Sequence, residues 1–206
     1  MRIFIRANPA GIVNRLVQHR GCHTAFYRSD MKEMPQDVLK IIDVRSDDEV
    51  ASAREIFEQY RSAHGGPDLE GEGIANEIAT LPGRYSKPNG ALLIACVGSE
   101  PAGCIALKRL DPLEGELKRL YVRPEYRGLG VGRALVTAIL AEAWALGMER
   151  LRLDTLPSMV GAQALYAAHG FKPRASYGGK SSSDTLFFEL RRKDLQPTAD
   201  SRVVRR

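Results

Sequence analysis

Apolar and polar residues along the chain form short blocks that predict strands, turns and helices in a regular order. Only a few turn residues separate the apolar runs at 91–97, 103–109 and 116–122, which is the spacing of antiparallel hairpins. Helical spacing of apolar residues occurs at 74–81 and at 46–62, where Ser46 or Asp47 is suited to cap the helix. The apolar runs of strand length in the first half lie at 39–44, 91–97, 103–109 and 116–122.

The pattern changes after Val122. A charged, glycine-rich turn at 123–132 precedes a run with helical spacing that ends at Gly147. Strand–helix–strand units usually have parallel strands. We therefore predict an α/β (α+β) fold, whose mixed central sheet starts as an antiparallel meander and continues with parallel strand–helix–strand units. The later strand, helix and strand are predicted at 151–155, 157–169 and 185–190.

Length and patterning limit how much of the chain belongs to this domain. The 206 residues, 44% of them hydrophobic, suffice for one domain and are too few for two of typical size. We expect a folded domain at 39–190, an N-terminal extension at 1–38 that is poorly ordered or dispensable, and a basic tail at 191–206. An organelle-targeting peptide or a segment upstream of the true start would also explain the Arg-rich beginning.

The net charge of +5 is concentrated at the two ends. Residues 1–30 contain five Arg and one Asp, and residues 191–206 contain six Lys or Arg and two Asp. Residues 31–190 contain 19 basic and 22 acidic groups, so the body is slightly acidic. A nucleic-acid-binding domain should have its basic excess on the folded body. This distribution weakens the nucleic-acid interpretation and leaves binding through the tails as an alternative.

Hydropathy and cysteine usage exclude further classes. No apolar run reaches eighteen residues, so no membrane-spanning helix is predicted. Cys22, Cys96 and Cys104 have no spacing that suggests a disulfide framework or a zinc cluster, and no His has a metal-ligand partner at a suitable spacing. We expect free thiols, a cytoplasmic location, no membrane association and no metal.

The segment 120–133 contains the residues that suggest chemistry. A strand enters a loop with glycines at 128, 130 and 132, and the loop opens into a helix whose first N–H groups form an anion site. Arg127 and Arg133 flank the loop and would add contacts to a phosphate. The sequence lacks the Gly-Lys-Ser/Thr of a P-loop, and its Gly-x-Gly-x-Gly spacing differs from the dinucleotide fingerprint.

The spacing Arg127-x-x-Gly130-x-Gly132 after a strand resembles the Arg/Gln-x-x-Gly-x-Gly/Ala motif of the Gcn5-related N-acetyltransferases (GNAT). A second element, Leu-Tyr-Ala-Ala-His-Gly-Phe at 165–171, resembles that family's Leu-Tyr-x-x-x-Gly-Phe. The resemblance covers about 39–190. It implies a metal-free reaction with acetyl-coenzyme A (acetyl-CoA) as co-substrate.

The resemblance also implies where acetyl-CoA binds. In this family the strand before the loop and the strand after the next helix part, and pantetheine lies in the gap. The thioester carbonyl would then lie near the Val122 amide, which could stabilise negative charge on that oxygen. The family often has Asn where this chain has Met159, so the pantetheine contact of that Asn is absent or made by Ser158. The cofactor-binding residues implied are Leu120, Tyr121, Val122, Arg127, Gly128, Leu129, Gly130, Val131, Gly132, Arg133 and Ser158.

Two residues are implied as catalytic. Tyr166 matches the family tyrosine that protonates the coenzyme A sulfur, and Glu116 lies where several members have a general-base carboxylate. The alternatives are a tyrosine that packs one ring face with its hydroxyl in water, a solvated glutamate, and a water chain as the base. In such proteins the stretch before the hairpins usually lines the acceptor site, and the alternative is that its acidic residues are simply solvated. Here this stretch contains Tyr85, Asp68, Glu70, Glu72 and Glu77.

The function implied is transfer of an acetyl group from acetyl-CoA to a primary amine by direct attack in a ternary complex. The acceptor is an amine of a small molecule or a protein, and its identity stays open. Relatives commonly form dimers, so a homodimer is an expectation. The alternative is a non-catalytic acetyl-CoA sensor or partner module on the same fold.

Overall fold

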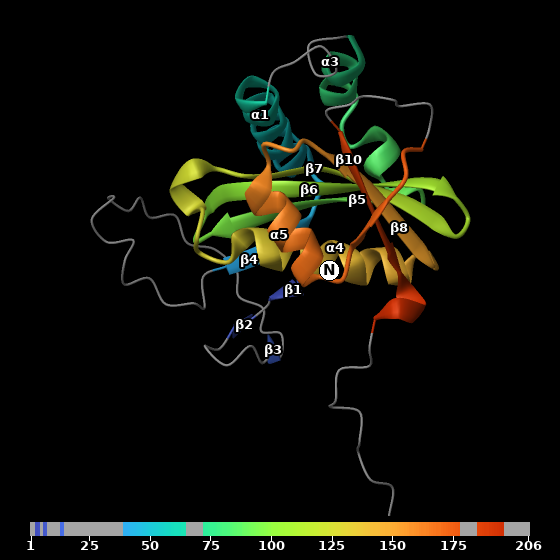
Figure 1. Cartoon of the computed structure of the whole chain (residues 1–206). Helices are drawn as coiled ribbons and strands as arrows, with labels where there is room; N and C mark the ends of the chain where they lie inside the picture. Colours follow the sequence, from blue (N-terminus) through green and yellow to red (C-terminus); the bar gives the residue numbers. More distant parts are fainter. Residues whose placement is uncertain are drawn as a thin grey trace, which may run out of the picture.

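The computed structural model contains a mixed β-sheet with helices on both faces (Figure 1). It describes residues 39–64, 72–177 and 185–195, together with the backbone of β1 (Ile3–Phe4), β2 (Arg6–Ala7) and β3 (Val13–Asn14). Within this described part the main sheet has eight strands in the order β1-β4-β5-β6-β7-β8-β10-β9, and β2 pairs with β3 separately. The mixed α/β fold class predicted from the sequence is confirmed.

The first half of the sheet is antiparallel, and its last three strands form the two hairpins that the spacing of apolar runs predicts. Two-residue turns at 98–99 and 112–113 join the last three of its strands, so the middle strand is longer than the 103–109 run. β1 extends the edge, with Ile3 opposite Ile41. The strands are β4 (Leu39–Asp43), β5 (Gly90–Val97), β6 (Glu100–Asp111) and β7 (Glu114–Val122).

Helices α1 (Asp47–Ala63) and α3 (Glu72–Ala79) cover one face of this half. The start of α1 is the one the sequence predicts, because Ser46 and Glu49 form a capping box: Ser46 Oγ accepts the Glu49 N–H at 3.4 Å, and Glu49 Oε2 accepts the Ser46 N–H at 3.0 Å. Ile56 and Phe57 of α1 pack with α3 and the short helix η3 (Gly83–Tyr85) into a core on this face.

Helices α4 (Val131–Ala145) and α5 (Val160–Ala168) lie on the opposite face, with the sheet between them and the first pair (Figure 1). Leu135 and Ile139 of α4 are fully buried in the larger core, and Tyr166 of α5 belongs to the same cluster. The domain therefore has two cores, one on each face of the sheet.

The second half of the sheet differs from the prediction in one pairing. β7 and β8 (Arg150–Thr155) are parallel, as predicted, but β10 (Leu186–Arg191) runs antiparallel to β8. The reason is β9 (Lys172–Arg174), a strand the sequence analysis missed. The chain crosses over through α5 into β9, which runs in the same direction as β8, and β10 then returns between the two. The short helix η5 (Arg192–Asp194) follows.

Helix α5 also begins later than expected, at Val160 rather than Pro157. Residues 156–159 form a turn in which the Met159 N–H donates to Leu156 O at 3.0 Å. Gln163 Nε2 reinforces the turn by donating to the carbonyls of Leu156 and Pro157, at 3.0 and 2.9 Å. Ser158 therefore lies in a turn at the end of β8 and is exposed.

Close approach of β6 to β7 gives a stability prediction at Gly103. A Cβ there would lie 2.4 Å from Tyr121 O and 3.2 Å from Val122 Cα. We expect Gly103→Ala to lower the free energy of unfolding by about 1–3 kcal/mol, because the two backbones must separate. Gly161→Ala is the matched control: a Cβ there meets nothing within 4 Å, and stability should stay equal or rise by about 0.5 kcal/mol. Denaturant titration measures both, and equal losses would contradict the steric account.

Candidate active site

A gap opens between β7 and β8 because their parallel pairing stops part-way along both strands. The paired residues are Glu114 with Arg150, Gly115 with Leu151 and Glu116 with Arg152. β7 continues to Val122 and β8 to Thr155, but beyond these three pairs the two strands no longer pair with each other. The two strand ends that have separated lead into the loop before α4 and the turn before α5. The gap therefore leads to the segments in which the sequence motifs lie.

The bend in β7 at this gap comes from a β-bulge. Three steps along β7, from Lys118 to Tyr121, match two steps along β6, from Ala106 to Cys104. Arg119 supplies the extra residue and has φ 57°, a left-handed conformation that costs a residue other than glycine about 1–2 kcal/mol. Local strain of this kind persists only where neighbouring groups fix it.

Buried contacts fix Arg119 in this conformation. Its Nε and Nη2 donate to the two carboxylate oxygens of Glu77 at 2.8 and 3.1 Å, and its guanidinium lies 5.5 Å from the Tyr60 ring centre. Cys104 Sγ donates to Arg119 O at 3.3 Å. Tyr85 completes the network by donating its hydroxyl to Glu77 Oε1 at 2.8 Å. Helices α1 and α3 therefore hold the bulge through side chains.

The bulge leaves two amides of β7 facing the gap. The Arg123 N–H donates to Ala102 O of β6 at 2.9 Å. Since neighbouring residues of a strand direct their backbone groups to opposite sides, the amides of Leu120 and Val122 point away from β6, where β8 has departed. Unpaired backbone groups require hydrogen-bond partners. The edge can therefore accept an extended ligand that binds as a strand does.

The glycines of the loop have different physical roles. After η4 (Pro124–Tyr126), Gly128 and Gly130 both have φ 80°, and a Cβ at either would meet nothing within 4 Å. Their conformation requires glycine, and the space beside them is open. Gly132 instead allows close packing, because a Cβ there would lie 3.2 Å from Leu165 Cδ2 of α5 and 3.7 Å from Val122 Cγ2.

The loop ends in an anion site at the start of α4. Gly130 is the N-cap, and the Ala134 N–H donates to its carbonyl at 3.0 Å. The N–H groups of Val131, Gly132 and Arg133 precede this first turn and lie at the positive end of the helix dipole. Leu129 and Arg133 are exposed beside them. This open cradle of amides fits a diphosphate.

Arg127 closes the loop rather than pointing freely into solvent. Its Nε donates to Val122 O at 3.0 Å, and its guanidinium lies 5.9 Å from the centre of the Tyr121 ring. The side chain therefore ties the end of β7 to the glycine loop.

Tyr166 is buried beside the gap, on α5. Only 6% of the residue is exposed, and its ring meets Phe171 edge-on at 5.7 Å between ring centres. Burial raises the pKa of the Tyr166 hydroxyl, with smaller contributions from Tyr60 and Asp154. The hydroxyl is therefore protonated at neutral pH. The role of Tyr166 as the proton donor stays a prediction.

Glu116 is buried at the closed end of the gap. It is 6% exposed and belongs to the last pair of residues that joins β7 to β8. Its Oε1 accepts the Tyr177 hydroxyl at 3.1 Å and lies 3.9 Å from Lys118 Nζ. Lys118 in turn pairs with Asp154 at 3.0 Å. The alternative of a solvated glutamate at a strand end is wrong for this residue.

The middle of the chain matches a known family. Residues 51–171, more than half of the sequence, match the model described as the acetyltransferase (GNAT) family. The chain belongs to the GNAT family of acetyltransferases. This family uses acetyl-CoA to acetylate its substrates.

Individual relatives agree with this membership. An uncharacterized N-acetyltransferase of Schizosaccharomyces pombe is 35% identical over 130 residues, which cover 61% of this chain and 78% of that protein. An acetyltransferase structure from Streptococcus agalactiae has a TM-score of 0.63 at 22% identity, over 75% of this chain and 98% of that one. A GNAT acetyltransferase of Elizabethkingia anophelis, solved with acetyl-CoA bound, has a TM-score of 0.52 at 18% identity, over 75% and 99%. The two structures show the shared GNAT fold.

Two residues expected at the acceptor wall of this GNAT domain lie elsewhere. Glu77 and Tyr85 are buried against Arg119 rather than lining an open surface, so that interpretation is wrong for them. The side chains of Asp68, Glu70 and Glu72 are outside the described residues. Ser158 lies in the exposed turn after β8, where its predicted role stays a prediction.

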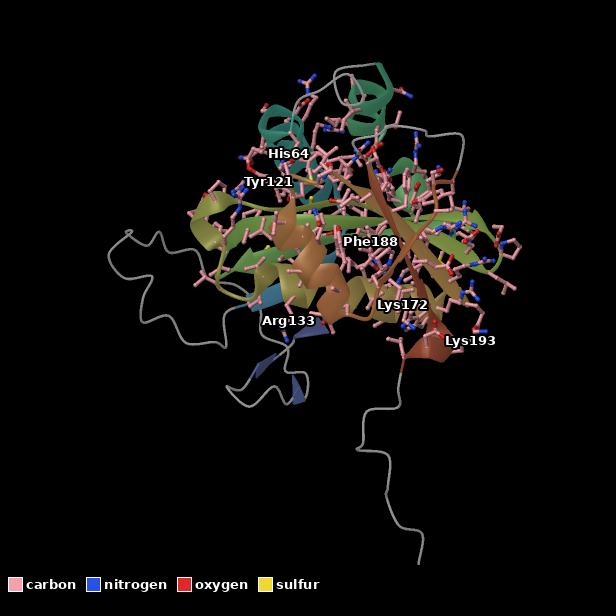
Figure 2. All side chains as sticks on the ribbon, in the orientation of Figure 1. His64, Tyr121, Arg133, Lys172, Phe188 and Lys193 are labelled. Carbon is pink, nitrogen blue, oxygen red and sulfur yellow. The ribbon has the colours of Figure 1, made fainter. Side chains whose placement is uncertain are left out.

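Sequence reasoning missed an aromatic cluster beside the GNAT gap. The rings of Tyr60, His64 and Tyr121 meet edge-on, with centres 4.9 to 6.2 Å apart, and Figure 2 shows His64 and Tyr121 side by side near the end of α1. Burial, with a smaller contribution from Arg127, lowers the pKa of His64, so this ring is neutral at physiological pH. Tyr177 was also missed, because its segment has no motif.

Other predicted features of the GNAT domain are also placed. His169 caps the C-terminus of α5, with its Nδ1 2.8 Å from Leu165 O. Cys96 and Cys104 are buried free thiols in β5 and β6, and Cys22 lies outside the described residues. Across 39–64, 72–177 and 185–195, no cluster of three metal-ligating side chains occurs. No helix in the described part is long and apolar enough to cross a bilayer.

The network around Glu77 predicts a pH-dependent stability. Burial would raise the pKa of Glu77, but Arg119 and Tyr85 outweigh it and the net pKa lies below the ordinary value of 4.5. The ionised Glu77 therefore adds to the free energy of unfolding above about pH 4.5. This stabilisation is lost as the pH falls through the pKa of Glu77 in the folded protein. We expect Glu77→Gln to lower the free energy of unfolding at pH 7 by about 3 kcal/mol, because the charge of Arg119 stays buried and unpaired.

Denaturant titrations at pH 7 and below pH 4 test this, with Glu58→Gln as the control. Glu58 pairs with Arg61 at 2.8 Å on the surface of α1, where such a pair contributes about 0–1 kcal/mol. The difference between Glu77→Gln and the wild type should shrink in acid, whereas the control should change little at either pH. Equal losses in both variants would contradict the role of the buried network.

Proposed function

We propose that the protein transfers the acetyl group of acetyl-CoA to a primary amine by direct attack in a ternary complex. The observation that supports this best is the gap between β7 and β8, with the amides of Leu120 and Val122 along one side and the glycine loop at its end. The acceptor is an amine of a small molecule or a protein. We expect a cytoplasmic enzyme, with a homodimer as its expected assembly.

The residues of the gap fit acetyl-CoA. The Leu120 and Val122 amides would pair with the pantetheine arm, and the N–H groups of 128–133 would bind the diphosphate. The open space beside Gly128 and Gly130 would admit the phosphates without a Cβ in the way. When bound, acetyl-CoA supplies an acetyl group activated as a thioester.

Two buried side chains would handle the protons of the reaction. A carbon–nitrogen bond replaces a carbon–sulfur bond, so the incoming ammonium must lose a proton and the coenzyme thiol must gain one. Tyr166 holds its proton because its pKa is raised, and it can give that proton to the sulfur. Glu116 can take the proton of the ammonium, directly or through water.

The anion site gives a prediction on acetyl-CoA binding. Gly130 and Gly147 lie at opposite ends of α4, both have φ near 80°, and a Cβ at either meets nothing within 4 Å. Alanine should therefore strain both to a similar extent. Only Gly130→Ala puts a methyl group at the amides that would bind diphosphate. We expect it to weaken acetyl-CoA binding about tenfold, or 1.4 kcal/mol.

Isothermal calorimetry with acetyl-CoA measures this difference. Gly147→Ala should bind like the wild type and show the same shift in melting temperature as Gly130→Ala. If the two variants bind equally well, the start of α4 is not the diphosphate site.

The catalytic assignment gives a prediction on turnover. We expect Tyr166→Phe and Glu116→Gln each to lower kcat by about 100-fold with an unchanged KM for acetyl-CoA, since positioned acids and bases typically contribute factors of this size. The control is Glu100→Gln, an exposed carboxylate at the start of β6, which should keep full activity.

Thiol release is measured with free amino acids, polyamines and peptides that carry free amino groups. Wild-type kcat values in both variants would disprove the two roles. Tight binding of acetyl-CoA without turnover on any amine would instead favour the sensor or partner module.

A further inference from the structure

A second tyrosine contacts the proposed base from a distant part of the chain. Tyr177, in the segment after β9, donates its hydroxyl to Glu116 Oε1 at 3.1 Å. Neither sequence motif includes Tyr177. The contact brings Tyr177 onto the face of the sheet where Glu116 lies.

The ring of Tyr177 is held by neighbours on several sides. The guanidinium groups of Arg152 and Arg174 each lie 5.0 Å from the ring centre, and the Phe187 ring meets it edge-on at 5.2 Å. The two arginines are themselves paired, Arg152 with Glu114 and Arg174 with Glu189. The direction of the hydroxyl is therefore set by packing that does not depend on Glu116.

The hydroxyl is a permanent donor at neutral pH. Burial and the nearby Glu116 carboxylate raise the pKa of Tyr177. A tyrosine with its proton in place can only donate to a carboxylate, so the contact fixes which oxygen of Glu116 the hydroxyl occupies.

The two contacts of the Glu116 carboxylate in the described structure fall on one oxygen. Tyr177 donates to Oε1, and the same Oε1 lies 3.9 Å from Lys118 Nζ, beyond hydrogen-bond distance. Lys118 is instead 3.0 Å from Asp154. Without the Tyr177 hydroxyl, the carboxylate could turn further toward Lys118, and the long ion pair between them would shorten and compete with the acceptor amine.

We propose that Tyr177 is a positioning residue for Glu116: it binds Oε1 and so keeps Oε2 for the proton of the acceptor amine. This inference rests on the proposed role of Glu116 as general base. A purely structural role is the alternative, in which the ring packs the segment after β9 onto the sheet and the hydroxyl is dispensable.

A double-mutant cycle separates these roles, because Tyr177→Phe removes the hydroxyl and keeps the ring between its arginines. We expect Tyr177→Phe to lower kcat about tenfold, with an unchanged KM for acetyl-CoA and nearly unchanged melting temperature. In the Glu116→Gln background the same change should alter kcat less than twofold, because a residue that acts through Glu116 has nothing left to position.

Tyr85→Phe is the matched control. Tyr85 also donates its hydroxyl to a buried glutamate, Glu77, at 2.8 Å, but it lies in the network around Arg119 rather than beside Glu116. Tyr85→Phe should change kcat by the same factor in the wild type and in the Glu116→Gln background. The melting temperature of the Tyr85→Phe variant should fall.

Two results would overturn the proposal, and they are distinguishable from each other. If Glu116→Gln lowers kcat but Tyr177→Phe does not, or lowers it equally in both backgrounds, Tyr177 only packs. If Glu116→Gln alone leaves kcat unchanged, the general-base assignment itself is wrong and the role of Tyr177 falls with it.

Discussion

The structure depends on the parting of β7 from β8 after Glu116 and Arg152. The backbone groups of a strand inside a sheet form hydrogen bonds with a neighbouring strand on each side. The last residues of β7 lack these hydrogen bonds on the side of β8. These backbone groups then need hydrogen bonds from water or from a ligand that takes the place of the missing strand. The amides of Leu120 and Val122 thus make backbone chemistry, rather than side-chain chemistry, the basis of the acetyl-CoA site we propose.

The gap stays open because side chains from the far face of the sheet fix its border. Arg119 sits in a left-handed conformation at the bulge, and Glu77 of α3 binds it with both oxygens. Arg123 makes a similar link to α1, donating to Gln59 and Glu55 at 2.9 and 2.8 Å. The helices of one face therefore shape a site that opens toward the helices of the other.

Local signals predicted much of this arrangement from the sequence. The capping box at Ser46, the turns between strands and the glycines of the loop each determine their own conformation, so their positions were predictable. The bulge at Arg119 was not, because nothing in the residue type favours a left-handed conformation. β9 is three residues long and contains a proline, and without it the direction of β10 was predicted wrongly. Tyr177 contacts Glu116, which lies 61 residues earlier in the chain, and no periodicity in the sequence reveals such a contact.

The two faces of β7 divide the proposed work. Leu117, Leu120 and Val122 pack toward α4 and α5, on the side of the glycine loop, while Glu116 and Lys118 alternate to the face of α1 and α3. The proposed donor site relies on amides and glycines together with Tyr166 of α5, whereas the proposed base, Glu116, and its contact Tyr177 belong to the other face. Side chains on that second face can therefore be substituted while the amides and glycines of the acetyl-CoA site we propose stay unchanged.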